Sequence, residues 1–140
     1  MGRLDRWADV SVHPSAKVTP GVVVYRLDDR LLFANSRYVK GRIREAVAGA
    51  PSTTRFLVFD AESFTGIDAS GVEALGQILD GLDQSDIVFV AARLKAHVEE
   101  RLGVTGIRDR IGPDRLFGSV EAAVDWCRSQ PTGQDDADVV

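Results

Sequence analysis

The chain has 140 residues, 44% of them apolar, and a formal net charge of −4. That length suits one soluble domain with a single core, and the acidic balance argues against a nucleic-acid-binding protein, which needs a basic surface. No apolar run reaches the roughly 18 residues of a membrane span, and residues 1–7 lack the apolar segment of a signal peptide. Cys127 is the single cysteine, so we expect neither an intramolecular disulfide nor a cysteine-based metal site.

The N-terminal region predicts an extension followed by two short strands. Residues 1–16 show no hydrophobic period and are expected to form a linker or N-terminal extension. Val22–Tyr25 follows a Pro-Gly turn signal and predicts a strand. Asp28-Asp29 separates it from a second apolar run, Leu31–Ala34. Two short runs around an acidic turn predict a hairpin, and therefore a mixed sheet.

A helix and a central strand come next. Asn35 or Ser36 is expected to cap the helix, which Gly49-Ala50-Pro51 ends and whose inner face is Val39, Ile43, Ala46 and Val47. Phe56–Phe59 is a continuous apolar run closed by Asp60. Such a run predicts a strand covered on both faces, as in the centre of an α/β sheet.

A second helix is predicted after the loop 61–67, because apolar residues recur there with the period of one helical face: Val72, Leu75, Gly76, Leu79 and Leu82. Ser70 and Glu73 form a capping-box pattern, so this helix is expected to begin at Ser70. The Ser70 hydroxyl would then lie at the positive end of the helix dipole, beside N–H groups without intrahelical acceptors.

The C-terminal half continues the alternation. Ile87–Ala91 predicts another buried strand, and the next helix is marked by Leu94, Val98 and Leu102. Residues 107–111 predict a short helical turn, and Leu116-Phe117 predicts either a short edge strand or a loop. Ser119 is expected to cap a last helix whose inner face includes Cys127.

Together these elements predict an α/β domain over residues 17–130. It has a small mixed sheet of about four to five strands, an N-terminal hairpin plus parallel crossovers, packed with four to five helices. Residues 131–140 are acidic and polar, and are expected to form a disordered tail.

No catalytic or metal site is predicted. His13 lies in the linker and His97 lies off the inner face of its helix, where a solvated role is expected. Metal-ligand spacings and a P-loop are both missing from the sequence. Asp60, Asp28-Asp29 and Lys95 resemble the acidic and basic positions of a phospho-accepting receiver domain, but such a domain needs a helix directly after the first strand. Asp60 is therefore predicted to be a strand-end or loop-capping residue.

Ser70 has two compatible interpretations. The first is an ordinary N-cap, which contributes about 1 kcal/mol to stability. The second is a chemical switch, because a phosphoserine adds nearly two negative charges that a helix N-terminus tolerates. A bound nucleotide phosphate would use the same N–H groups. Asp68 would oppose either added charge, which favours a switch that releases a partner.

Two motifs resemble a known family. The segment Asp68–Leu75 resembles the D-x-S-G-x-x-x-L signature of STAS domains, shared by sulfate transporters and anti-sigma-factor antagonists. Val24–Asp28 followed by Leu31–Asn35 is similar to the opening of STAS domains at the C-terminus of SulP-type anion permeases. The resemblance covers residues 20–128.

The resemblance implies a non-catalytic cytoplasmic regulatory domain of a sulfate or related anion transporter, on the cytoplasmic side of the plasma membrane. Its partner would be the membrane domain of the parent, with no nucleic acid involved. Ser70 matches the serine that a kinase phosphorylates in antagonist relatives. The resemblance also implies a site for GDP, GTP or ATP, with no other cofactor, at Ser63, Thr65, Gly66, Asp68, Ser70, Gly71 and Val72. Because the chain is acidic overall, we expect the affinity to be weak.

Two alternatives stay open. One is a free-standing anti-sigma-factor antagonist, in which Ser70 is phosphorylated and a protein partner docks on its helix. The other is a nucleotide hydrolase, whose turnover Asp68→Asn would abolish.

Overall fold

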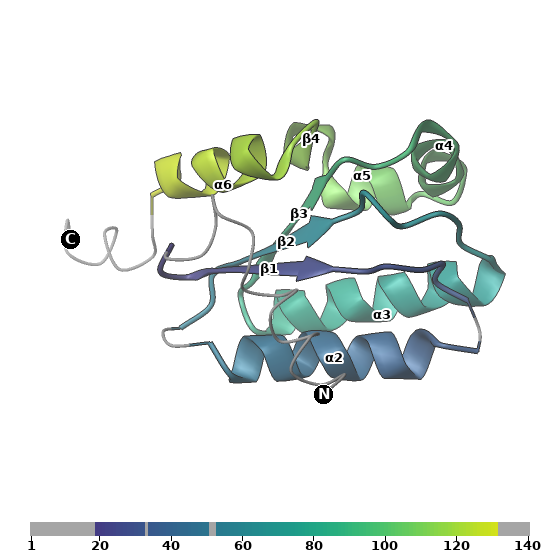
Figure 1. The fold of residues 1–140 in the computed structure, drawn as a ribbon, viewed down its shortest axis with the longest axis horizontal. Coiled ribbons are helices and arrows are strands. Elements are labelled where there is room, and N and C mark those ends of the chain that lie inside the picture. The colour runs from purple at the N-terminus through teal and green to yellow at the C-terminus, as the bar shows by residue number, and fades with distance from the viewer. Residues whose placement is uncertain (1–18, 33, 51–52, 132–140) are drawn as a thin grey trace.

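The structure is a computed structural model that describes residues 19–32, 34–50 and 53–131. This part of the chain is a parallel sheet covered by helices on both faces (Figure 1). The elements in chain order are β1 (Val22–Arg26), α2 (Ser36–Ala48), β2 (Phe56–Asp60), α3 (Ala69–Gln84), β3 (Val88–Ala92), α4 (Ala96–Val104), α5 (Ile107–Ile111), the 3-10 turn η1 (Pro113–Arg115), β4 (Leu116–Phe117) and α6 (Val120–Ser129).

The sheet has the strand order β1-β2-β3-β4, and every pairing in it is parallel. Val22 lies opposite Phe56, and Phe56 lies opposite Val88, so the first three strands are in register. Each parallel pair needs a crossover, which α2, α3 and the α4–α5 segment supply. The carboxyl ends of β1, β2 and β3 therefore lie side by side at one edge of the sheet.

Alternation along the strands gives the sheet two apolar faces. Leu57 and Phe59 belong to the core shared with α2, α3, α4 and α5, whereas Phe56 and Val58 belong to the core shared with α6. Figure 1 shows α6 on one side of the sheet and α2 and α3 on the other. All five residues of β2 are buried, which confirms the predicted central strand.

The predicted N-terminal hairpin is wrong. Leu31 forms an isolated parallel bridge with Ile67 instead of pairing with β1, so the described sheet is parallel and not mixed. The Asn35 side chain gives the physical reason. Its Nδ2 donates to the Arg30 carbonyl over 2.6 Å and its Oδ1 accepts from the Leu32 N–H over 2.9 Å, which occupies groups that an antiparallel ladder would use.

The predicted fold class, the edge strand and the cap of the last helix are confirmed. The α/β class is confirmed, and residues 116–117 form the short edge strand β4. Ser119 caps α6, since its Oγ accepts from the Ala122 N–H over 3.0 Å. Asn35 stands at the N-cap position of α2, but its side chain does not cap that helix. The predictions for residues 1–16 and for the tail beyond Pro131 lie outside the described residues.

Cys127 is a core residue, as predicted. It is 3% exposed, and burial raises the pKa of its thiol to about 12. A thiol with so little thiolate at neutral pH is a poor nucleophile. Within the part of the chain that the structure describes, we find no helix with the length and apolar character needed to span a membrane.

The start of α3 is held against residues 31–32 by a close backbone approach. Gly71 is buried, and a Cβ on it would overlap the Leu31 carbonyl oxygen and lie 2.8 Å from Cγ1 of Ile67. The Leu31 N–H donates to the Gly66 carbonyl over 2.9 Å, and the Asp68 N–H donates to the Leu31 carbonyl over 3.3 Å. Only glycine fits at position 71 without displacing this backbone.

We expect Gly71→Ala to lower the free energy of unfolding by about 3 kcal/mol, because the backbone of residue 31 or the helix must move. Gly41→Ala is the matched control. It lies inside α2 with no atom within 4 Å of its added Cβ, so it should raise stability by about 0.5–1 kcal/mol. Urea unfolding of both variants measures the difference. Equal effects of the two substitutions would contradict the proposed close contact.

Candidate functional site

Asp68, and not Ser70, caps α3. Its backbone is extended (φ −100°, ψ −178°), and its Oδ1 accepts a hydrogen bond from the Gly71 N–H over 2.7 Å. The helix begins at Ala69, so Ser70 lies inside its first turn and is half-buried. The predicted capping box is therefore wrong, because an N-cap side chain must come before the first helical residue.

The seven residues predicted to bind a phosphate lie in one segment, from the loop after β2 to the first turn of α3. The hydroxyl of Ser63 accepts from Nη2 of Arg26 over 3.1 Å. The Thr65 carbonyl lies 2.9 Å from Nε2 of His97, an exposed residue as predicted, and this contact joins the loop to α4. Gly66 lies against the Arg30 side chain.

Asp68, Gly71 and Val72 are already hydrogen-bonded to one another. The Gly71 N–H is bound by the Asp68 carboxylate, and the Val72 N–H donates to the Asp68 carbonyl over 2.9 Å. Val72 also packs against the larger core. Two of the N–H groups that a phosphate would use thus have partners. Ser70 is half-buried in the same turn.

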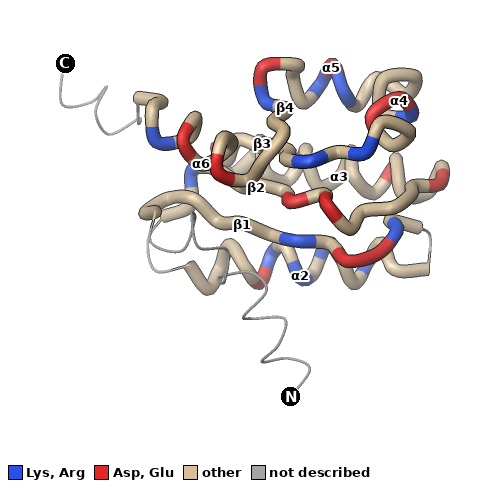
Figure 2. Tube along the Cα trace, turned by 45° about the horizontal axis from the view of Figure 1, so that its top comes forward, with Lys and Arg blue, Asp and Glu red and all other residues tan. Residues whose placement is uncertain are grey.

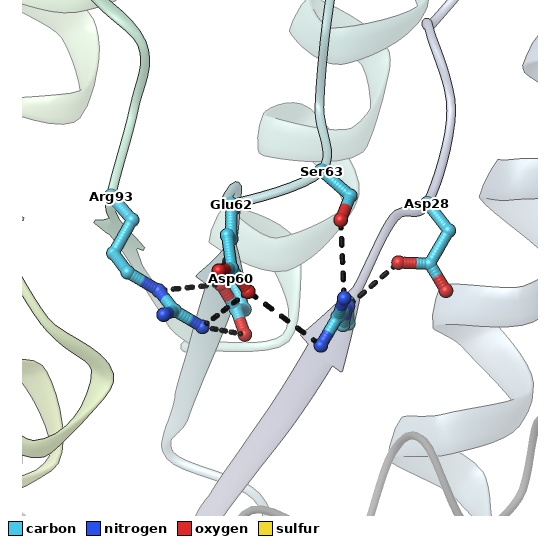
Figure 3. Close-up of polar contacts among 6 residues, drawn as sticks. Asp28, Asp60, Glu62, Ser63 and Arg93 are labelled. Carbon is cyan, nitrogen blue, oxygen red and sulfur yellow. Dashed lines mark hydrogen bonds and ion pairs between the residues drawn. The ribbon is translucent and has the colours of Figure 1, made fainter.

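A network of charged side chains occupies the carboxyl edge of the sheet (Figure 3). We call it the carboxyl-edge cluster; its members are Arg26, Asp28, Asp60, Glu62, Ser63 and Arg93. Asp60 is only 1% exposed and meets Arg93 through two bonds, Nε to Oδ1 over 3.3 Å and Nη2 to Oδ2 over 3.0 Å. Glu62 lies 3.1 Å from Nη2 of Arg93 and 3.7 Å from Nη1 of Arg26.

The cluster neutralises a buried charge. A buried carboxylate without a partner would be costly, and the paired geometry of Arg93 offsets that cost. The hydrogen bond to Asp60 in turn raises the pKa of Arg93, and the hydrogen bond to Asp28 raises the pKa of Arg26. Arg93 adopts a left-handed backbone (φ 63°) and its N–H donates to the Phe117 carbonyl over 2.8 Å. The pair therefore ties the ends of β2, β3 and β4 together.

Sequence reasoning predicted the strand-end role of Asp60 correctly but missed both arginines. Their positions could have indicated the pairing. Arg26 ends β1 and Arg93 directly follows β3, and both strands are neighbours of β2 in the sheet. Lys95, which resembles the basic residue of a receiver domain in sequence, makes no ion pair with the described residues. Asp28 is exposed and bonded to Arg26, so it does not join Asp60 in an acidic pocket.

The arrangement is suited to holding the loop after β2 in place. The side chains of the described residues include no group of three His, Cys, Asp or Glu placed to hold a metal ion. The carboxylates of the cluster are matched by arginines, and His97 contacts a backbone carbonyl. The loop is thus fixed at several points beside the half-buried Ser70.

Comparison with known proteins identifies the family. The family model described as "STAS domain" matches residues 13–123. This chain belongs to the STAS domain family. Among curated proteins, a probable sulfate transporter of Mycobacterium tuberculosis is 36% identical over 116 residues, which is 83% of this chain and 21% of that protein. Sulfate transporter 1.3 of Arabidopsis thaliana is 34% identical over 129 residues, 86% of this chain and 20% of that protein.

This STAS domain thus spans about a fifth of the length of the curated relatives it matches. Solved structures share its fold. The STAS domain of a SulP transporter from Vibrio cholerae superposes with a TM-score of 0.67 at 16% identity, over 89% of this chain and 95% of that chain. The unphosphorylated anti-sigma-factor antagonist SpoIIAA superposes with a TM-score of 0.63 at 18% identity, over 82% of this chain and 95% of that chain. Murine Slc26a9 superposes with a TM-score of 0.72 at 19% identity, over 80% of this chain and 18% of that chain.

The correction at the start of α3 is testable by substitution. We expect Asp68→Ala to lower the free energy of unfolding by about 1 kcal/mol, because the Gly71 N–H loses its acceptor. Asp68→Asn keeps an oxygen at the same place and should cost a few tenths of that, about 0.3 kcal/mol. Ser70→Ala should change stability by less than about 0.5 kcal/mol. If chemical denaturation showed a larger loss for Ser70→Ala than for Asp68→Ala, Ser70 would be the cap after all.

Proposed function

We propose that this STAS domain is a regulatory part of a sulfate or related anion transporter, acting on the cytoplasmic side of the membrane through contacts with the transporter's membrane domain. The observation that carries the proposal is the likeness to sulfate transporters over 83–86% of this chain but only 20–21% of theirs. A domain that matches one fifth of a transporter is suited to controlling the rest of that protein.

The regulatory surface that we propose is the loop after β2 together with the first turn of α3. Contacts from three directions fix this segment: Arg26 holds Ser63, His97 contacts Thr65, and Leu31 holds Gly66. A rigid segment presents the same surface each time a partner meets it, so less ordering entropy is lost on binding. Ser70 lies at the end of this segment, half-buried, where an added group would change the surface.

Phosphorylation of Ser70 is the modification that this site supports best. A phosphoserine would add nearly two negative charges in the first turn of α3, where the helix dipole tolerates them. The cap carboxylate of Asp68 lies two residues away and would repel the phosphate, which would push the added group outward. The expected result is an altered contact surface on an intact helix, and therefore release of a bound partner.

Nucleotides are the second ligand class that we propose for the same segment. GDP, GTP or ATP would place a phosphate near Ser70, with the side chains of Ser63 and Thr65 beside it. Because the Gly71 and Val72 N–H groups already have acceptors and Asp68 is anionic, the affinity should be weak. No other cofactor is proposed.

A free-standing anti-sigma-factor antagonist is the alternative function. What favours it is the similarity in fold to SpoIIAA, which has been solved both unphosphorylated and phosphorylated, with TM-scores of 0.63 and 0.58. In that function Ser70 would be the kinase substrate, and a protein partner would dock on α3.

The size and location of the native polypeptide distinguish the two functions. An antibody raised against this chain should detect, in its source cells, a polypeptide several times larger than 15.2 kDa that sediments with membranes and dissolves only in detergent. Cells lacking the gene provide the control for specificity. A band near 15 kDa in the soluble fraction would contradict the transporter proposal and support the antagonist.

A further inference from the structure

A groove of about 270 Å³ runs between α2 and α3, and no residue of the loop after β2 lines it. Its floor is apolar and includes Ile43, Ile78 and Leu82, which also belong to the larger core. Its rim includes Lys40 and Arg44 on the α2 side and Gly81 on the α3 side. We call this surface the α2–α3 groove. The groove thus combines an apolar floor with a basic rim, in a chain whose net charge is −4.

The positive charge is concentrated on α2. This helix carries four basic side chains, Arg37, Lys40, Arg42 and Arg44, against one acidic side chain, Glu45, which leaves three net positive charges. Figure 2 shows blue positions along α2 with red at one place. Arg42 pairs with Glu45 over 2.7 Å, so that acid is already engaged.

The two cations of the groove have no carboxylate partner within the described part of the chain. Lys40 donates to the neutral side-chain oxygen of Gln77 over 2.6 Å. Arg44 is exposed and makes no ion pair with the described residues. Both are therefore available to carboxylates supplied from outside, and a pair formed at the edge of an apolar surface is less screened than one in open water.

The opposite rim allows a backbone to approach closely. Gly81 is exposed, and a Cβ built on it would have no atom within 4 Å. Glycine at an exposed position inside a helix costs about 1 kcal/mol relative to alanine. A position without a side chain beside an apolar floor leaves room for a second helix to lie along the groove.

We propose that the α2–α3 groove binds an acidic amphipathic helix of a partner protein, with apolar side chains over Ile43 and Leu82 and carboxylates against Lys40 and Arg44. An anionic membrane would also be attracted to α2. The apolar surface, however, is recessed between α2 and α3. The side chains of a partner helix can reach into this recess, whereas a flat bilayer surface cannot. The proposal does not depend on the transporter function.

The test is an amide NMR titration of the 140-residue chain with a synthetic amphipathic peptide, leucine at positions i, i+3, i+4 and i+7 and glutamate elsewhere. We expect saturable shifts at residues lining the groove. Arg44→Glu should weaken binding at least about fivefold, because one attraction becomes a repulsion. Arg101→Glu makes the same charge change on an exposed part of α4 and should leave affinity within about twofold.

A second variant tests shape separately from charge. Gly81→Leu should fill the rim and abolish the peptide shifts. Its amide spectrum should remain that of the folded protein, because no atom lies within 4 Å of the added Cβ. The proposal is overturned if the peptide causes no shifts at the groove, or if Arg44→Glu and Arg101→Glu weaken binding equally. It is also overturned if vesicles containing phosphatidylserine shift the groove amides and the peptide does not, since the surface would then be a membrane contact.

Discussion

The contact between the Leu31 backbone and the first turn of α3 is the constraint on which the candidate site depends. The Leu31 N–H and carbonyl bond to Gly66 and Asp68, one on each side of Ile67, and the absence of a side chain at Gly71 lets the helix close on that carbonyl. This contact joins the segment after β1 to the segment after β2. It sets where α3 begins, and so where the Ser70 hydroxyl lies.

Charge pairing fixes the other end of the same loop. Asp60 is almost completely buried, and Arg93 reaches it from the turn after β3 with a left-handed backbone. Glu62 then lies close to both arginines, and Arg26 adds a bond to Ser63. Burying a charged group contributes little net stability, but it specifies one arrangement of the chain when every alternative leaves the charge unpaired. The cluster therefore determines the path of the loop that leads to Ser70.

The sequence predicts the α/β class, the buried central strand and the core position of Cys127 because those follow from hydrophobic period and run length. It does not predict that Leu31 bridges to Ile67, because β-pairing partners are chosen by tertiary packing. Likewise, a serine and an aspartate two residues apart both suit an N-cap, and only the position of the helix start decides between Asp68 and Ser70. To predict the pairing of Asp60 with Arg93, one must know which strands are neighbours in the sheet.

If the Leu31 contact organises the site, the amides that form it should open together. The measurement is native-state hydrogen exchange of the Leu31, Asp68 and Gly71 N–H groups, each of which donates a hydrogen bond at this junction. The account predicts that all three exchange with one common opening free energy, well above that of frayed helix ends. Fast exchange of Gly71 and Asp68 at the rate of an unprotected first turn, with Leu31 still protected, would contradict it.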